Sequence, residues 1–312
     1  MTFDCEAASL LPKNILFGTS SWNYEGWKGT IYKREYKSEK AFSQESLSEY
    51  AHFPWFRTVG IDASFYGPLH GPTLERYASQ LPAGFRWVSK VWEEISVPFF
   101  GKHPRYGPRA GKENPHFLNA ELFCERVLKP LEAPHIFRHV GPLVFQFQSM
   151  PLQHHDAQER FLRKLDKFFT DLPTQFEYAC EIRNPELLSQ HYFDLINHFG
   201  VAHCFNHWTS MPPLVQQMKS AAAAGSLKAN FFIARLLTPL GVNYEDAVKL
   251  YAPYTSLKAP IESAREDAVR LILRGVERQI STYILVNNRL EGHAPSTIDA
   301  IGRMAVAALH LR

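Results

Sequence analysis

Eight short apolar segments recur along this 312-residue chain, and each is followed by a helical pattern or a long connection. We expect strands at residues 15–22, 57–66, 85–92, 143–148, 178–184, 201–208, 230–236 and 281–288. Strands that alternate with helices form a parallel sheet with helices on its faces. Eight such units in a chain of this length predict an α/β fold, a single (β/α)8 TIM-type barrel.

An open doubly wound sheet is the alternative fold. It calls for a glycine-rich phosphate turn after the first strand, and Gly18 and Gly26 do not make that fingerprint. No internal repeat, low-complexity tract or linker divides the chain. We therefore expect one domain over residues 1–312, in which residues 1–14 form an N-terminal extension.

Composition narrows the class of protein only slightly. Lys and Arg number 34 against 31 Asp and Glu, and they are scattered, so nucleic-acid binding is neither indicated nor excluded. The four cysteines lack metal-knuckle spacing, which suggests a reducing compartment. No signal peptide and no run near the roughly 18 apolar residues of a membrane span is evident. The expectation is a soluble cytoplasmic protein without a membrane partner.

Polar residues collect at the carboxyl ends of the expected strands, where barrels of this type form their sites. They are Trp22, Asp62, Ser64, Lys90, Gln146, Gln148, Glu181, Arg183, Asn206, His207, Arg235, Asn287 and Asn288. Any one charged member could equally belong to a structural ion-pair network inside the barrel. Polar ends on nearly every strand favour a polar pocket.

Asp62 and Glu181 come from different strands and are candidates for an acid/base pair. Lys90, Arg183 and Arg235 are candidates for binding a phosphate or carboxylate, and Lys90 could also form a Schiff base. The alternative is that Glu181 pairs with Lys90 or Arg183, and Asp62 with an arginine or a backbone N–H.

Other residue types give weaker indications. His203 and His207 share one face of a strand but lie well apart, and no His-x-His or His-Glu-x-x-His motif exists, so we predict no metal site. His154 and His155 resemble an exposed helix start. The sequence indicates no particular cofactor.

Aromatic residues also gather near the expected barrel mouth. Trp22, Tyr24, Trp27, Phe65 and Tyr66 could stack on a sugar or a base, or could pack together to close the top of the barrel.

Several short motifs together resemble one known family, the YecE-like barrels, or domain of unknown function 72. They lie at residues 17–22, 59–66, 88–90, 144–147, 181–183, 235, 287–288 and 294–295. The resemblance spans nearly the whole chain. It implies a TIM-type barrel and supplies no established activity.

Two departures from the family pattern affect the site. The family usually reads Val-Glu-Ile-Asn in the second strand, whereas this chain has Gly60 for the Glu and Asp62 for the Asn. The family often has His-Gly shortly after the position of Arg235, where this chain has Leu237 and Thr238. The long loops at 98–115 and 238–260 could mark a subgroup with a changed substrate.

The leading prediction is an enzyme, a hydrolase or acid/base catalyst, that acts on a small anionic or phosphorylated substrate. Its catalytic candidates are Asp62, Glu181 and Lys90, and its substrate-binding candidates are Trp22, Tyr66, Gln146, Arg183, His207, Arg235, Asn287 and Asn288. The alternative is a barrel that binds nucleic acid or another ligand without catalysis. A glycosidase is a third possibility, which calls for two carboxylates roughly 5–10 Å apart.

Overall fold

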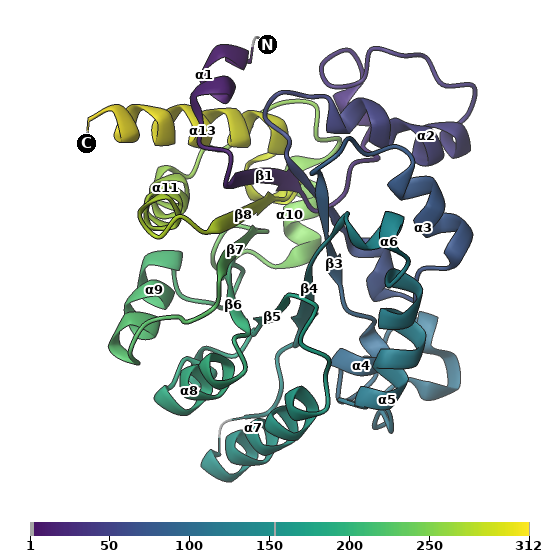
Figure 1. Cartoon of the computed structure of the whole chain (residues 1–312), viewed down its shortest axis with the longest axis vertical. Helices are drawn as coiled ribbons and strands as arrows, with labels where there is room; N and C mark the ends of the chain where they lie inside the picture. Colours follow the sequence, from purple (N-terminus) through teal and green to yellow (C-terminus); the bar gives the residue numbers. More distant parts are fainter. Residues whose placement is uncertain (1–2, 153, 312) are drawn as a thin grey trace.

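The computed structural model describes residues 3–152 and 154–311, and its strands form an eight-stranded parallel barrel wrapped by helices (Figure 1). The strands are β1 Ile15–Thr19, β2 Thr58–Ile61, β3 Arg86–Lys90, β4 Val140–Gln146, β5 Tyr178–Glu181, β6 Ala202–His207, β7 Phe231–Leu236 and β8 Ser281–Val286. Hydrogen-bonded neighbours follow the order β1-β8-β7-β6-β5-β4-β3-β2. The predicted (β/α)8 TIM-type barrel is confirmed.

The helices occupy the connections between strands. They are α1 Cys5–Leu10, α2 Glu39–Ala51, α3 Gly71–Ala78, α4 Glu93–Ser96, α5 Ala120–Phe123, α6 Pro134–Phe137, α7 His155–Thr170, α8 Gln190–His198, α9 Leu214–Ala223, α10 Tyr244–Tyr251, α11 Glu262–Glu277, α12 Asn288–Glu291 and α13 Ala294–His310. The predicted N-terminal extension contains α1, which lies against α13, where the Asp4 N–H donates to Asp299 at 2.8 Å. Within residues 3–152 and 154–311, the helices are too short or too polar to cross a bilayer.

Strand alternation places one apolar layer inside the barrel and a larger one between the strands and the helices. On β5, Tyr178 and Cys180 pack outward, whereas Ala179 belongs to the interior layer. Glu181 follows on the inward face, at the carboxyl end of the strand. The apolar interior therefore ends in a polar layer at the C-terminal face.

The barrel closes between β1 and β2, where two glycines allow the backbones to approach. The Arg57 N–H donates to the Phe17 carbonyl at 2.8 Å across this seam. A Cβ on Gly18 would lie 2.2 Å from the Thr58 carbonyl oxygen, and one on Gly60 would lie 2.9 Å from the Ser20 oxygen. Larger residues at either position would push the two strands apart.

The second strand is shorter than predicted. It ends at Ile61, and the residues from Asp62 to Phe65 form a single 3-10 turn, η2 Asp62–Phe65. The Ser64 hydroxyl stabilises this turn by donating to the Ile61 carbonyl at 2.6 Å. The period-two alternation predicted through residue 66 therefore stops at residue 61, and Asp62 projects from a turn.

Gly18→Ala is expected to destabilise the protein by about 1–3 kcal/mol, because the added methyl group would overlap the β2 backbone. Gly71→Ala is the matched control, since an added Cβ at that helix start meets no atom within 4 Å. Urea unfolding of both variants measures the difference. Equal stabilities would contradict the tight seam.

Candidate functional site

A cavity of about 600 Å³ opens at the carboxyl ends of the strands. That volume is typical of small-molecule sites. It is lined by Asp62, Phe65, Tyr66, Lys90, Gly101, Lys102, His103, Arg105, Tyr106, Gln146, Gln148, Arg183, Trp208, Arg235, Leu237, Tyr244, Glu245, Asn287 and Arg289. Six of these side chains are Lys or Arg and two are carboxylates, so the cavity favours an anion.

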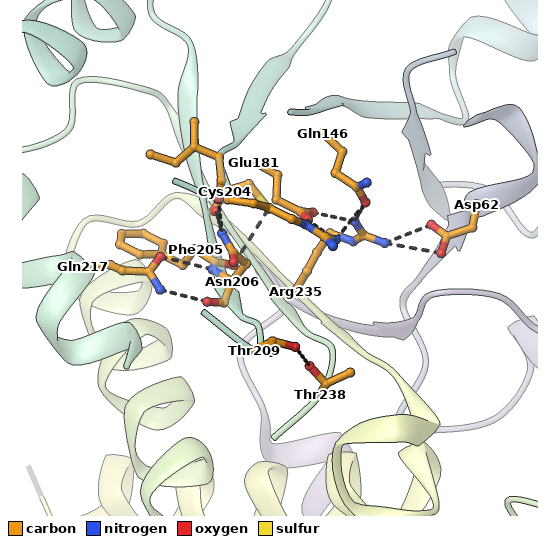
Figure 2. Close-up of polar contacts among 12 residues, drawn as sticks. Asp62, Gln146, Glu181, Cys204, Phe205, Asn206, Thr209, Gln217, Arg235 and Thr238 are labelled. Atoms are coloured by element: carbon orange, nitrogen blue, oxygen red, sulfur yellow. Dashed lines mark hydrogen bonds and ion pairs between the residues drawn. The ribbon is translucent and has the colours of Figure 1, made fainter. Parts of the chain in front are cut away.

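A buried ion-pair network forms the floor of this cavity (Figure 2). Glu181 is 0% exposed; its Oε1 accepts from Arg183 Nη2 at 2.8 Å, and its Oε2 accepts from Arg235 Nη1. Gln146 stands opposite Glu181 in the β4–β5 register, and its Oε1 accepts from Arg183 at 3.0 Å and from Arg235 at 3.3 Å. Both arginines are therefore oriented by one carboxylate and one amide.

Asp62 extends the network toward β2. Arg235 Nη2 donates to the two carboxylate oxygens of Asp62 at 3.0 and 3.3 Å, so Arg235 bridges Asp62 and Glu181. Burial by itself would raise the pKa of Glu181, but the charges of Arg235, Arg183 and Lys90 lower that pKa to about 2. Glu181 is thus ionised at neutral pH and is unsuited to be a general acid.

Lys90 differs from the two arginines because it lacks an ionic partner. Its Nζ lies 4.1 Å from the Phe65 ring centroid. No described residue forms a hydrogen bond or ion pair with this Nζ atom, which faces the cavity. Burial lowers the pKa of the Lys90 ammonium to about 8, against the opposing influence of the Asp62 charge. An amine with such a pKa can donate or accept a proton near neutrality.

Arg289 is a second cation without an ionic partner among the residues that the structure describes. It follows β8, its guanidinium lies 4.4 Å from the Tyr244 ring centroid, and its Nε is buried without a hydrogen-bond partner. Two further stacks line the cavity, Arg183 at 3.7 Å from the Trp208 ring and Arg105 at 4.8 Å from the Tyr66 ring. Aromatic faces thus hold guanidinium groups around the mouth.

Most of the predicted site residues meet in this cavity. Those that line it are Asp62, Tyr66, Lys90, Gln146, Arg183, Arg235 and Asn287. Glu181 lies behind them, joined to both arginines. The predicted pairing of Glu181 with Arg183, and of Asp62 with an arginine, is what the structure shows.

Besides Glu181, three of the predicted substrate-binding residues do not line the cavity. His207 is buried on the outward face of β6, where its Nδ1–H donates to the Thr238 carbonyl at 2.8 Å, and burial lowers its pKa. Trp22 is buried beyond the end of β1 and packs edge-on against Tyr77 at 5.1 Å. Asn288 is the first residue of α12 and is buried.

Asn288 has a structural role in the chain turn after β8. Its Oδ1 accepts from the Ala294 N–H at 2.8 Å, which ties α12 to the start of α13. The neighbouring Asn287 accepts from the Arg289 N–H at 3.0 Å and lines the cavity. Only one of the two asparagines therefore faces the site.

Several cavity residues were missed by sequence reasoning. They are Lys102, His103, Arg105, Tyr106, Trp208, Tyr244, Glu245 and Arg289. All but Trp208 and Arg289 lie in the two loops already singled out by their length, which contain the 3-10 segment η3 Pro104–Arg109 and the helix α10. Loop length was the available signal, but it does not say which side chain turns inward.

Comparisons with known proteins identify the class. A family model described as "Protein of unknown function DUF72" matches residues 16–310. The chain therefore belongs to the DUF72 family, a group of barrel proteins of uncharacterised function. No curated protein matches the chain in sequence.

Solved structures of the family share the fold. A DUF72 family protein from Enterococcus faecalis is 16% identical, with 94% of this chain and 95% of that chain covered and a TM-score of 0.62. One from Thermotoga maritima is 17% identical, with 93% and 98% covered and a TM-score of 0.59. At these identities the likeness shows the fold alone.

Glu181→Gln is expected to destabilise the protein by about 3–5 kcal/mol at pH 7, because two buried guanidinium groups lose their anion. Since the folded pKa of Glu181 is depressed to about 2, its stabilisation is present above pH 4.5 and is lost as pH falls toward 2. In urea unfolding from pH 7 to 2.5, the variant should lose less free energy of unfolding on acidification than wild type does. Glu75→Gln, at an exposed glutamate, serves as the control. An equal loss of stability on acidification in wild type and Glu181→Gln would contradict the network.

Lys90→Met is expected to remove a rise in stability at alkaline pH. The folded pKa of Lys90 lies near 8 and its ordinary value is 10.5, so between these values the unfolded chain holds a proton that the folded protein has released. Stability therefore rises with pH across that window, and between pH 7.5 and 9.5 the rise is on the order of 2 kcal/mol. Urea unfolding at pH 7.5 and 9.5 compares wild type with the variant, and parallel pH dependences would refute this assignment.

Proposed function

We propose that this protein is an enzyme that binds a small phosphorylated or carboxylated substrate in the mouth cavity and transfers a proton through Lys90. One observation carries the proposal: Lys90 and Arg289 face the cavity without an anionic partner among the described residues. A partly buried cation without a counter-ion is costly. A bound anion would offset that cost, and Gln146 and Asn287 line the same cavity as further hydrogen-bonding groups.

The roles proposed for the two carboxylates differ. Glu181 is a positioning residue, since it holds Arg183 and Arg235 and has no exposed surface. The Asp62 side chain is 31% exposed and faces the cavity. Asp62 as base and Lys90 as acid therefore replace the Asp62–Glu181 pair as the acid/base candidates for hydrolysis or proton transfer.

A glycosidase mechanism has weaker support. It calls for one carboxylic acid that is protonated at neutral pH. The low pKa of Glu181 leaves that role unfilled, and Asp62 already contacts Arg235.

Nucleic-acid binding is the second candidate, and one feature favours it. Tyr66 is 65% exposed at the cavity rim and carries Arg105 on its ring, an arrangement on which a base could stack. Such binding would weaken steeply as salt rises, whereas capture of a small anion inside the cavity would weaken less.

Thermal unfolding against orthophosphate, sugar phosphates, dicarboxylates and short oligonucleotides tests the proposal. A small anion should raise the melting temperature by mass action. Lys90→Met and Arg289→Gln should each weaken its binding by about 10–100-fold, the loss of one charge-assisted hydrogen bond. Lys219→Met, which removes an exposed lysine of α9 that does not line the cavity, should leave binding unchanged.

Two outcomes would count against the proposal. If no small anion stabilises the wild type while oligonucleotides do, the binding alternative replaces it. If a small anion stabilises wild type and both cavity variants equally, the anion binds elsewhere.

A further inference from the structure

A second cluster of titratable side chains, two imidazoles and one carboxylate, lies outside the barrel between α7 and α8. These helices pack side by side (Figure 1). His155 is the first residue of α7, Glu159 lies one turn later, and His191 is near the start of α8. One donor atom from each of the three side chains lies within 4.8 Å of the other two.

The distances are close to those of a metal site. His191 Nδ1 lies 3.3 Å from Glu159 Oε1, and His155 Nε2 lies 4.0 Å from the same oxygen. Tetrahedral zinc, ~2.1 Å from each ligand, holds its ligand atoms ~3.4 Å apart. Of the three ligand pairs, Glu159–His191 already has that separation, and the two pairs that include His155 need a rotation of His155, whose side chain is 75% exposed.

The donor set also suits a particular class of ion. Two imidazoles and one carboxylate are a recurrent zinc-binding set, and imidazole suits Zn²⁺, Cu²⁺ and Ni²⁺, while Mg²⁺ prefers oxygen ligands. Three protein ligands on an exposed surface leave further coordination positions to water. The three side chains therefore favour a divalent transition metal of intermediate softness, such as Zn²⁺, over Mg²⁺.

Two local charges oppose a cation here. Both histidines lie in first helical turns, where the helix dipoles are positive. Arg163 also lies 3.5 Å from Glu159 Oε2. The Glu159 carboxylate must offset both effects, so the charge on Glu159 should matter more than its shape.

We propose that His155, Glu159 and His191 form a surface site for a divalent transition metal, zinc in the first instance, that clasps α7 to α8. The site is independent of the cavity and of the function proposed for it. Sequence spacing did not indicate this metal site. His155 and Glu159 lie one turn apart on α7, and His191 on α8 reaches them only because the two helices pack together. The clasp would stabilise the outer helical layer beside β4 and β5, the strands that carry Gln146 and Glu181.

Isothermal titration of tag-free protein with ZnCl₂, with MgCl₂ as the negative control, tests this proposal. Wild type should bind one zinc ion at this site and melt at a higher temperature in its presence. Glu159→Gln and His191→Ala should each weaken zinc binding by at least about tenfold, the lower end of what loss of an outer-shell partner costs a metal site. Arg163→Gln should strengthen it, because a competing cation is removed.

His154→Ala is the matched control. His154 is an exposed neighbour whose side chain caps no helix, and it lies outside the cluster. Its loss should leave zinc affinity unchanged, and metal-free melting temperatures of all variants should stay close to wild type. Absence of zinc binding by wild type, or equal affinity in His154→Ala, His191→Ala and Glu159→Gln, would overturn the proposal.

Discussion

The arrangement of the cavity depends on one fully buried carboxylate. Glu181 has no exposed surface, so its charge is tolerable only while both of its oxygens accept from guanidinium groups. Satisfying them brings Arg183 and Arg235 together from neighbouring regions of the barrel, and Arg235 then reaches Asp62 on the far side. The end of β5 is thereby joined to β7 and to the turn after β2, and the floor of the site is preorganised.

This constraint separates two pairs of cations in the mouth. Arg183 and Arg235 are largely committed to Glu181 and Gln146, and their geometry is fixed by protein partners. Lys90 and Arg289 rest on aromatic rings instead, which supply weak attraction without neutralising charge. The first group shapes the site, and the second group supplies the charge that an anionic ligand can use.

Periodicity allowed much of the fold and part of the site to be predicted. Alternation on β5 turns Glu181 inward, because Tyr178 and Cys180 take the outward positions in the core beneath the helices. The same alternation on β6 turns Asn206 inward and His207 outward, and neither reaches the cavity, because Asn206 is fully buried and donates to the Ile182 carbonyl. Residues outside the strands, such as Arg289 on the short helix α12, do not follow the strand period, and their direction depends on tertiary contacts.

The seam between β1 and β2 restricts where a carboxylate can stand near the end of β2. A side chain at Gly60 would collide with the Ser20 backbone, because its Cβ would lie 2.9 Å from the Ser20 oxygen. Asp62, on the η2 turn, supplies the carboxylate that faces Arg235. The Asp62 side chain is partly exposed on a turn, so an incoming anion of the kind proposed could displace it from Arg235 Nη2, whereas the buried Glu181 cannot be displaced. Arg235 Nη1 would then keep its contact with Glu181, and the floor of the site would stay intact.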